Sequence, residues 1–227
     1  MKKAALLVFV LWVCSCSFAA NPFAIRHQGN DLWQKKFPPR YDSVSQRFLL
    51  RNEQAKFSRK FLRGSLEVMV YDMFSTALLF ALPYEISKWS KPDIGKVNSQ
   101  YRKTFTQRPA YDPDLWYVNY IGHPYTGACY YNSVRSQGAT FWQAILFTMG
   151  YSVVWEYVAE GGLEQPSIQD LVVTPVVGSI LGELFHHFTL VMSRNGFKWY
   201  EKLFVSLFNP MFAINNGFKY ARPIPLP

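Results

Sequence analysis

Apolar residues in this chain recur mostly at the spacing of a helix, which predicts an all-α fold. In residues 44–63 they are interleaved with Lys and Arg, so we expect a basic amphipathic helix that can lie flat on a membrane. Residues 66–82 are apolar almost throughout and end at Pro83, which predicts a helix buried on all sides. Residues 88–108 are polar and basic, and they predict a linker between two halves of the chain.

The second half predicts further helices, so we expect an aromatic-rich, membrane-associated bundle of about five or six in all. These helices cover residues 115–134, 141–160, 167–192 and 197–208. His123 and Pro124 interrupt the first of them, because proline lacks the amide hydrogen that a helix interior needs. Alternatively, Pro124 begins a helix that His123 caps. Ser167 and Asp170 have the spacing of a capping box and mark a helix start.

The first twenty residues have the layout of a secretory signal peptide, in which Lys2 and Lys3 precede a short apolar run and small residues follow. The run is too short to span a bilayer comfortably, which favours cleavage over anchoring. Two alternatives remain: ordinary cleavage near Ala19 or Ala20, or a lipoprotein leader whose Cys16 is lipidated. In both, Cys129 is the only cysteine beyond the leader, so no internal disulfide can form.

The formal net charge of +9 is concentrated in the middle of the chain. Residues 26–108 hold sixteen Lys and Arg against seven Asp and Glu, whereas residues 110–227 hold six against eight. An exported protein meets anionic lipid far more than nucleic acid, so we expect a membrane lipid surface or an envelope protein as partner and no nucleic acid. The alternative is that these charges only solvate exposed helix faces.

The chain is expected to divide into a leader, a basic region with amphipathic and apolar helices, a helical domain and an irregular tail, at residues 1–20, 21–110, 111–218 and 219–227. Twenty uncharged residues separate Arg135 from Glu156, which is long enough to span a bilayer. A multi-pass arrangement would place the basic region outside, against the positive-inside rule. We therefore expect an exported bundle that touches the periplasmic face of a bacterial membrane, the outer membrane being preferred.

Polar side chains of the second half lie on otherwise apolar helices, where helical spacing can gather them. The expected buried network comprises Asn119, His123, Glu156, Glu160, Asp170, Glu183 and His187. We interpret it as hydrogen bonding that satisfies polar groups between packed helices, with no cofactor. Should the chain be an enzyme, the candidate catalytic residues are His123, Glu156, Glu160, Glu183 and His186.

Glu183 and His186 have the Glu-x-x-His spacing of di-iron bundles and are the candidate metal ligands. Only one copy of this motif is present, and the chain lacks a His-Glu-x-x-His zinc signature. A divalent metal is therefore kept as the alternative to a metal-free network. Gly178 and Gly182 have the Gly-x-x-x-Gly spacing that lets two helices approach closely.

Four segments of the second half resemble, in order and spacing, the bacterial family called domain of unknown function 3943. They are residues 119–127 (NYIGHPYTG), 155–160 (WEYVAE), 164–170 (EQPSIQD) and 174–183 (TPVVGSILGE). The resemblance covers residues 112–218 and implies an exported or envelope setting, but no activity or substrate. A weaker similarity to VanZ-like membrane proteins rests on a histidine, a glutamate-bearing helix and an Asp followed by Gly-x-x-x-Gly.

Three classes of function follow from these patterns. The preferred one is a non-catalytic envelope protein that docks on a membrane or a partner and holds a buried His/Glu/Asp network. The alternative is a hydrolase acting on an envelope lipid or glycan, with Glu156 or Glu183 as general base and His123 or His186 as acid or metal ligand. The second alternative is a multi-pass membrane protein such as a transporter or channel. The sequence defines no oligomeric state.

Overall fold

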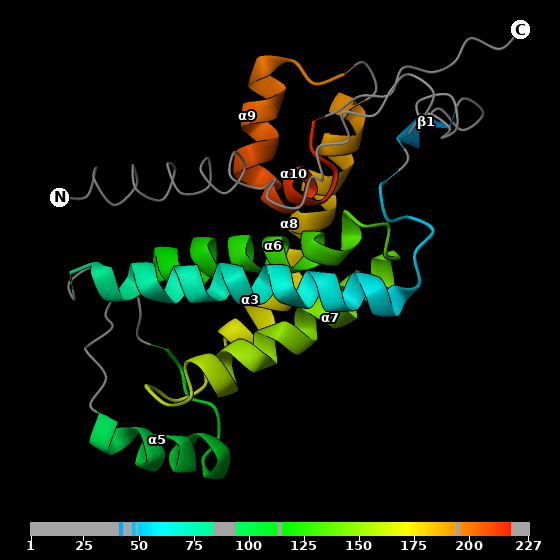
Figure 1. The fold of residues 1–227 in the computed structure, drawn as a ribbon. Helices are drawn as coiled ribbons and strands as arrows, with labels where there is room; N and C mark the ends of the chain where they lie inside the picture. The colour runs from blue at the N-terminus through cyan, green and yellow to red at the C-terminus, as the bar shows by residue number, and fades with distance from the viewer. Residues whose placement is uncertain are drawn as a thin grey trace, which may run out of the picture.

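The computed structural model describes residues 41–42, 47–48, 50–83, 94–112, 115–193 and 196–218. Over these residues the chain is a bundle of helices, which confirms the predicted all-α class (Figure 1). A two-residue antiparallel pair of strands, β1 (Tyr41–Asp42) and β2 (Arg47–Phe48), precedes the helices. The predicted leader with Cys16 and the predicted tail lie outside the described residues.

The helical elements account for most of the described residues. In chain order they are α3 (Phe57–Ala81), α5 (Ile94–Thr106), η1 (Val118–Gly122), α6 (His123–Arg135), α7 (Phe141–Val154), η2 (Trp155–Ala159), α8 (Asp170–Ser193), α9 (Trp199–Phe208) and α10 (Pro210–Asn216). The two η elements are π-helical turns that continue directly into or out of an α-helix. Such turns often mark functional positions.

Helix α6 lies at the centre of the bundle, between α3 and α8. Helix α3 runs opposite to α6, since Lys60 Nζ donates to the Gly138 carbonyl at 2.7 Å while Tyr71 Oη lies 3.1 Å from Thr126 Oγ1. The core between these helices and α7 is mainly aromatic and aliphatic. It includes Val68, Tyr130, Tyr131, Val134, Ala144 and Phe147.

Helices α6 and α8 run in the same direction and touch through glycine. A Cβ on Gly127 would overlap the Thr174 carbonyl oxygen, and a Cβ on Gly178 would lie 2.6 Å from Gly127 Cα. A Cβ on Gly182 would lie 2.7 Å from the ring of Tyr131. The predicted role of the Gly-x-x-x-Gly pair in close helix packing is therefore confirmed, and it fixes the register between α6 and α8.

The two helices predicted at 44–63 and 66–82 are wrong as separate elements, because one helix, α3, covers Phe57–Ala81. Gly64 does not break it, since α6 packs so closely there that a Cβ would lie 2.5 Å from Val134. The basic residues at the start of α3 are not all available to lipid. The ammonium of Lys60 is buried and donates to backbone carbonyls of Glu53 and Gly138 at 2.8 and 2.7 Å.

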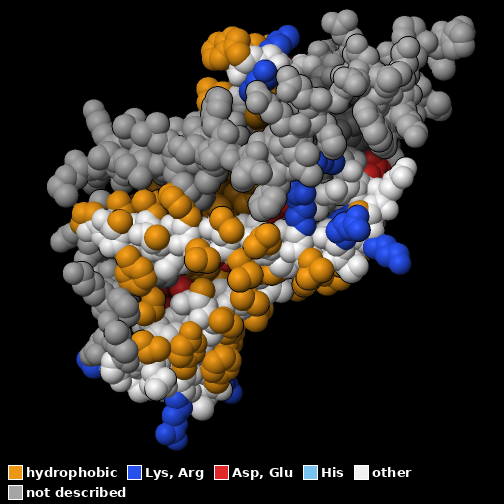
Figure 2. All heavy atoms as spheres, in the orientation of Figure 1, with side chains coloured by type: hydrophobic (Ala, Val, Ile, Leu, Met, Phe, Trp, Pro, Cys, Tyr) orange, Lys and Arg blue, Asp and Glu red, His pale blue; other side chains and the backbone are white. Residues whose placement is uncertain are grey.

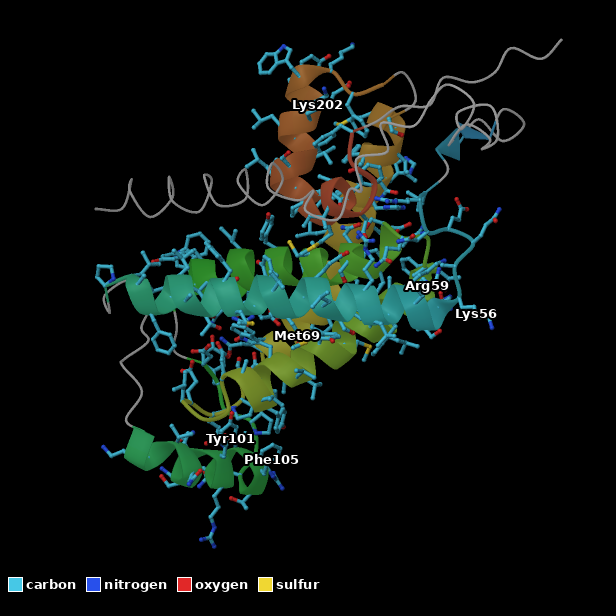
Figure 3. All side chains as sticks on the ribbon, viewed as in Figure 1. Lys56, Arg59, Met69, Tyr101, Phe105 and Lys202 are labelled. Atoms are coloured by element: carbon cyan, nitrogen blue, oxygen red, sulfur yellow. The ribbon has the colours of Figure 1, made fainter. Side chains whose placement is uncertain are left out.

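The linker predicted at 88–108 is also wrong over most of its length, because α5 forms there. Tyr101 Oη donates to the Val158 carbonyl at 2.6 Å, and Phe105 packs against Tyr157 with ring centroids 5.7 Å apart. Helix α5 thus docks beneath η2, where Figure 3 marks Tyr101 and Phe105. Its helical state depends on this tertiary contact, which local polarity does not reveal.

At the end of the chain, α9 stops before Asn209-Pro210 as predicted, but another helix, α10, follows at once. Asn209 accepts a hydrogen bond from the Phe212 amide at 3.2 Å and so caps α10, while Pro210 occupies its first turn. At His123-Pro124 the chain stays helical, with η1 leading into α6. The predicted break is therefore wrong, because Pro124 needs no amide hydrogen in a first turn.

Much of the outer surface of α3, α7 and α8 is apolar and exposed. Leu62, Met73 and Trp142 are 70%, 71% and 71% exposed, and exposed aliphatic residues continue along α8. Figure 2 shows such side chains along α3 and below it, with Lys and Arg gathered at the start of α3, where Figure 3 marks Lys56 and Arg59. Helices α3 and α8 are long and apolar enough to cross a membrane, by length and composition only.

Candidate metal centre

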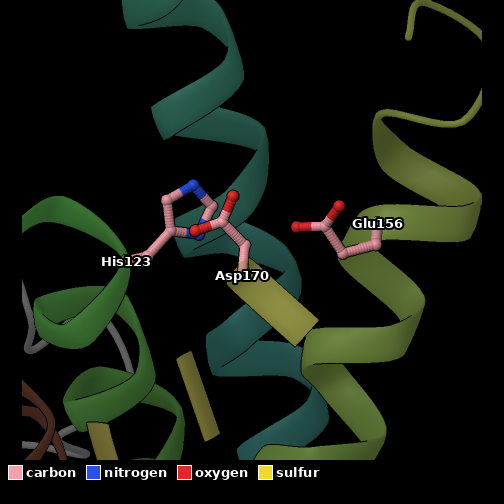
Figure 4. A group of neighbouring side chains, drawn as sticks. All are labelled: His123, Glu156 and Asp170. Atoms are coloured by element: carbon pink, nitrogen blue, oxygen red, sulfur yellow. The ribbon is translucent and has the colours of Figure 1, made fainter. Parts of the chain in front are cut away.

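Three ionisable side chains from different parts of the chain converge at one end of the bundle. His123, Glu156 and Asp170 each offer a ligand atom, and these atoms all lie within 4.8 Å of one another. Figure 4 shows the Asp170 carboxylate between the other two groups, with α3 behind. Glu156 and Asp170 are 2% and 1% exposed, so both carboxyls are withdrawn from water.

Local structure places Glu156 in the π-helical turn η2, two residues beyond the end of α7. Its Oε2 accepts a hydrogen bond from the Ser167 amide at 2.7 Å, across the loop that leads to α8. This bond orients one carboxylate oxygen toward backbone and leaves the carboxyl group beside Asp170. A carboxylate anchored in this way loses little side-chain freedom when it binds a ligand.

Asp170 is positioned by the start of α8. Ser167 Oγ accepts a hydrogen bond from the Asp170 amide at 3.1 Å, as a capping residue does from the third residue of a helix. The cap therefore fixes the backbone of Asp170 and turns its side chain toward the bundle. Neither carboxylate oxygen of Asp170 makes a well-aligned hydrogen bond to any described residue, although both are buried.

His123 is the first residue of α6 and the least enclosed member of the group, with 13% of its side chain exposed. Its Nδ1 lies 3.1 Å from Thr174 Oγ1 and 3.8 Å from Asp170 Oδ1. Thr174 stands one turn after Asp170 on α8, so both imidazole contacts come from the same helix. The close packing of Gly127 against Gly178 brings α6 near enough for these contacts.

Burial shifts the ionisation of all three groups toward their neutral forms. Burial is the main reason that the pKa of Glu156 rises to about 8, and the charge of Asp170 also raises it. The hydrogen bond from the Ser167 amide lowers this pKa, but by less. Burial likewise raises the pKa of Asp170 and lowers the pKa of His123 to about 4. At neutral pH, His123 is therefore an uncharged imidazole with a lone pair, and the Glu156 carboxyl retains a proton, because two buried anions side by side would repel each other.

Glu160 and Asn119 flank this group. Burial raises the pKa of Glu160 well above its usual range, and the nearby Glu156 carboxyl adds to the shift. Asn119 is 1% exposed and precedes His123 by four residues, and its Oδ1 has no hydrogen-bond partner among the described residues. Of the expected network, His123, Glu156 and Asp170 thus come together, and Glu160 interacts with them electrostatically.

Glu183 belongs to a second cluster. Both of its carboxylate oxygens bind Arg135, at 2.8 and 2.9 Å, and Oε2 also accepts from Tyr131 Oη at 2.7 Å. Thirteen residues of helix separate Glu183 from Asp170, or about 20 Å at 1.5 Å per residue. A single active site that combines His123 with Glu183 is therefore ruled out.

The predicted metal ligands Glu183 and His186 do not form a ligand group within the described residues. Glu183 is engaged by Arg135, and His186 is buried with no hydrogen-bond partner for Nδ1. His187 is exposed on α8 and so takes no part in a buried network, which corrects its predicted place there. Neighbouring positions of a helix face different directions, and only the packing shows which one points inward.

Sequence reasoning missed Thr174, which supplies the hydroxyl beside His123. The only signal is its place four residues after Asp170, on the same helix face. It also missed the phenol of Tyr130, which donates to Asp72 Oδ1 at 2.7 Å and ties α6 to α3. A carboxyl in the otherwise apolar run of α3 was the available clue.

Comparison with known proteins bears on the same part of the chain. Residues 108–211 match a family model whose description is Domain of unknown function (DUF3943), which confirms the predicted resemblance over this segment. His123, Glu156 and Asp170 all lie within the matched segment. Neither the curated proteins nor the solved structures gave a match. The similarity to VanZ-like proteins stays a prediction.

Proposed function

We propose that this chain is a membrane-associated, exported helical protein of the bacterial cell envelope that binds a divalent metal ion through His123, Glu156 and Asp170. The observation that carries the proposal is the convergence of these three ligand atoms within 4.8 Å in a buried site. A buried Asp170 carboxylate without a well-aligned hydrogen bond is costly unless a proton or a cation compensates it.

The ligand types indicate which metals fit. One neutral imidazole and two carboxylates suit a first-row transition ion such as Zn²⁺ or Mn²⁺ better than Ca²⁺, which prefers oxygen ligands alone. The lowered pKa of His123 keeps its imidazole ready to bind at neutral pH. A cation would also remove the repulsion between Glu156 and Asp170 that burial aggravates. The residues present therefore fit the ion.

A second candidate function is metal-dependent hydrolysis of an envelope lipid or glycan. Three protein ligands leave room for water on a four-coordinate ion, and such an ion acts as a Lewis acid and lowers the pKa of that water. Glu160 favours this function, because burial raises its pKa well above its usual range and the nearby Glu156 carboxyl adds to the shift, so it can hold a proton beside the centre.

Membrane association is supported by the apolar outer surface of α3, α7 and α8. A monomer in water rarely exposes so many large apolar side chains side by side, because each costs hydration free energy. The two long apolar helices favour the same conclusion. The exported setting and the periplasmic face are proposed from the predicted leader.

Metal binding is tested with the purified mature protein, stripped with a chelator and titrated with Zn²⁺ and Mn²⁺ separately in a calorimeter. We expect one ion per chain, and a loss of affinity of at least a hundredfold in His123→Ala and in Glu156→Gln. His187→Ala and Glu201→Gln are matched controls outside the centre and should bind like the wild type. Equal affinities in all five proteins, or no binding, would contradict the proposal.

A further inference from the structure

We infer that Asp112 is a fourth ligand of this centre, delivered by the strap formed by residues 110–112. The inference rests on the proposed metal binding and deepens it. None of the patterns considered in the sequence indicated Asp112, because it precedes the predicted helical segments of the second half. The structure places it next to the loop that leads into α8.

The strap is fixed by backbone hydrogen bonds. Ala110 pairs with Ser167 as an isolated parallel bridge, in which the Ala110 amide donates to Pro166 O and the Ile168 amide donates to Ala110 O, both at 2.9 Å. These bonds lie within four residues of Asp170. The strap therefore follows the loop that carries the cap of α8.

The side chain of Gln169 then holds Asp112 itself. Its Nε2 donates to the Asp112 carbonyl at 3.0 Å, and its Oε1 accepts from the Asp112 amide at 3.3 Å. Both main-chain groups of Asp112 are thus occupied by the residue directly before Asp170. The two hydrogen bonds hold the partly buried residue beside the start of α8.

The carboxyl of Asp112 lies outside the group of three ligand atoms that are within 4.8 Å of one another, but it interacts with every member of that group. It approaches the Asp170 carboxyl as a hydrogen-bond partner, and its charge acts on His123 and on Glu156. Two carboxyls that share a hydrogen bond need a proton or a cation between them. A metal ion held by His123, Glu156 and Asp170 would supply that cation and would attract the Asp112 carboxylate.

If Asp112 is a fourth ligand, its removal should weaken metal binding without abolishing it. The other three groups remain when Asp112 is lost, so the ion still binds but more weakly and with a changed coordination. Loss of one group near a metal typically costs about 10- to 100-fold in affinity. The same change should follow, to a smaller extent, when Gln169 no longer holds the strap.

The test compares wild type, Asp112→Asn, Asp112→Glu, Gln169→Ala and the surface control Glu201→Gln, each first shown to be folded by circular dichroism. Zn²⁺ affinity is measured by competition with a chelating dye, and the visible absorption of bound Co²⁺ reports the ligand set. We expect Asp112→Asn to bind about 10- to 100-fold more weakly with an altered Co²⁺ spectrum, Asp112→Glu to restore part of the affinity, and Glu201→Gln to match the wild type.

The outcomes distinguish the proposed metal centre from the proposed fourth ligand. If His123→Ala abolishes binding while Asp112→Asn keeps both the affinity and the Co²⁺ spectrum of the wild type, the fourth ligand is refuted and the metal centre stands. If the wild type binds neither Zn²⁺ nor Co²⁺, both are refuted. A weaker affinity with a changed spectrum in Asp112→Asn supports both.

Discussion

At the scale of single residues, the centre is a set of groups whose environment opposes their charged forms. Glu156 and Asp170 are carboxyls almost without contact with water, and His123 is a base held neutral by burial. Such an arrangement is stable without metal only when a carboxyl carries a proton. The folded apo protein is therefore expected to hold protons that the unfolded chain would release.

This gives a pH dependence with a definite sign. The pKa of Glu156 rises from 4.5 to about 8 on folding, so between these values the folded state binds the extra proton and loses stability as the pH rises. The pKa values of His123 and His186 fall from 6.5 to about 4 and 3 on folding. These two groups therefore reduce the free energy of unfolding only when the pH falls below 6.5. Between pH 6.5 and 8 the carboxyl effect therefore acts without opposition from these imidazoles.

We predict that the free energy of unfolding of the apo protein rises when the pH is lowered from 8 to 6.5, and that Glu156 alone contributes roughly 1–2 kcal/mol of this rise. Urea unfolding at the two pH values measures it. Glu156→Gln should show a smaller dependence but keep part of it, because burial also raises the pKa values of Glu67, Asp72 and Glu160. Glu201→Gln should keep the dependence of the wild type. If the apo protein instead became less stable when the pH is lowered from 8 to 6.5, Glu156 would be ionised in the folded state.

At the scale of helices, the centre depends on the glycine contact between α6 and α8. That contact sets the register that puts His123 opposite Thr174 and Asp170. An added methyl group at Gly127 has no room, because it would meet the backbone of α8 rather than a movable side chain. The two helices would have to separate, and the centre would open with them.

Gly127→Ala should therefore destabilise the protein by roughly 1–3 kcal/mol and weaken metal binding as well. Gly150→Ala is the matched control, because no atom lies within 4 Å of the added methyl group on α7. The control should be neutral or stabilise the helix by about 0.5–1 kcal/mol. Thermal unfolding and zinc titration of both variants measure the two effects, and equal stabilities would show that the close contact does not exist.

The same scale shows what the sequence could predict. Periodicity and capping located α7, α8 and α9 within a few residues, because their signals are local, as with Ser167 before Asp170. Helix α5 escaped prediction because its polar sequence is held by Tyr101 and Phe105 against η2. The start of α3 was misplaced because basic residues before Phe57 continue the pattern without continuing the helix.

The candidate site was foreseeable only in part, for a similar reason. Spacing along one helix relates Glu183 to His186 and Glu156 to Glu160, but it does not say which helix faces which. The distance between His123 and Glu183 depends on the register between α6 and α8, which Gly127 and Gly178 set. Asp112 lies on no helix, so no periodic pattern reaches it.

At the scale of the whole molecule, the apolar outer surface of α3, α7 and α8 decides how the protein meets a membrane. Lys56 and Arg59 stand exposed at the start of α3, whereas Lys60 is bound internally. The apolar side chains far outnumber the exposed charges beside them on this helix. Attraction between charges should therefore guide binding and apolar contact should maintain it.

We predict that the purified protein floats with anionic vesicles and stays bound when the salt concentration is raised, because salt screens charges but not apolar contact. Leu62→Glu combined with Met73→Glu should reduce the bound fraction strongly, whereas Lys56→Gln combined with Arg59→Gln should reduce it slightly. Release of the wild-type protein by salt alone would assign the attachment to charge.

The central claim concerns where the metal sits, and anomalous X-ray diffraction tests it most directly. Crystals grown with Zn²⁺ and measured on both sides of its absorption edge should show one strong anomalous peak per chain, between His123, Glu156 and Asp170. A peak beside Glu183 and His186 instead, or none in crystals at saturating zinc, would contradict the proposed centre.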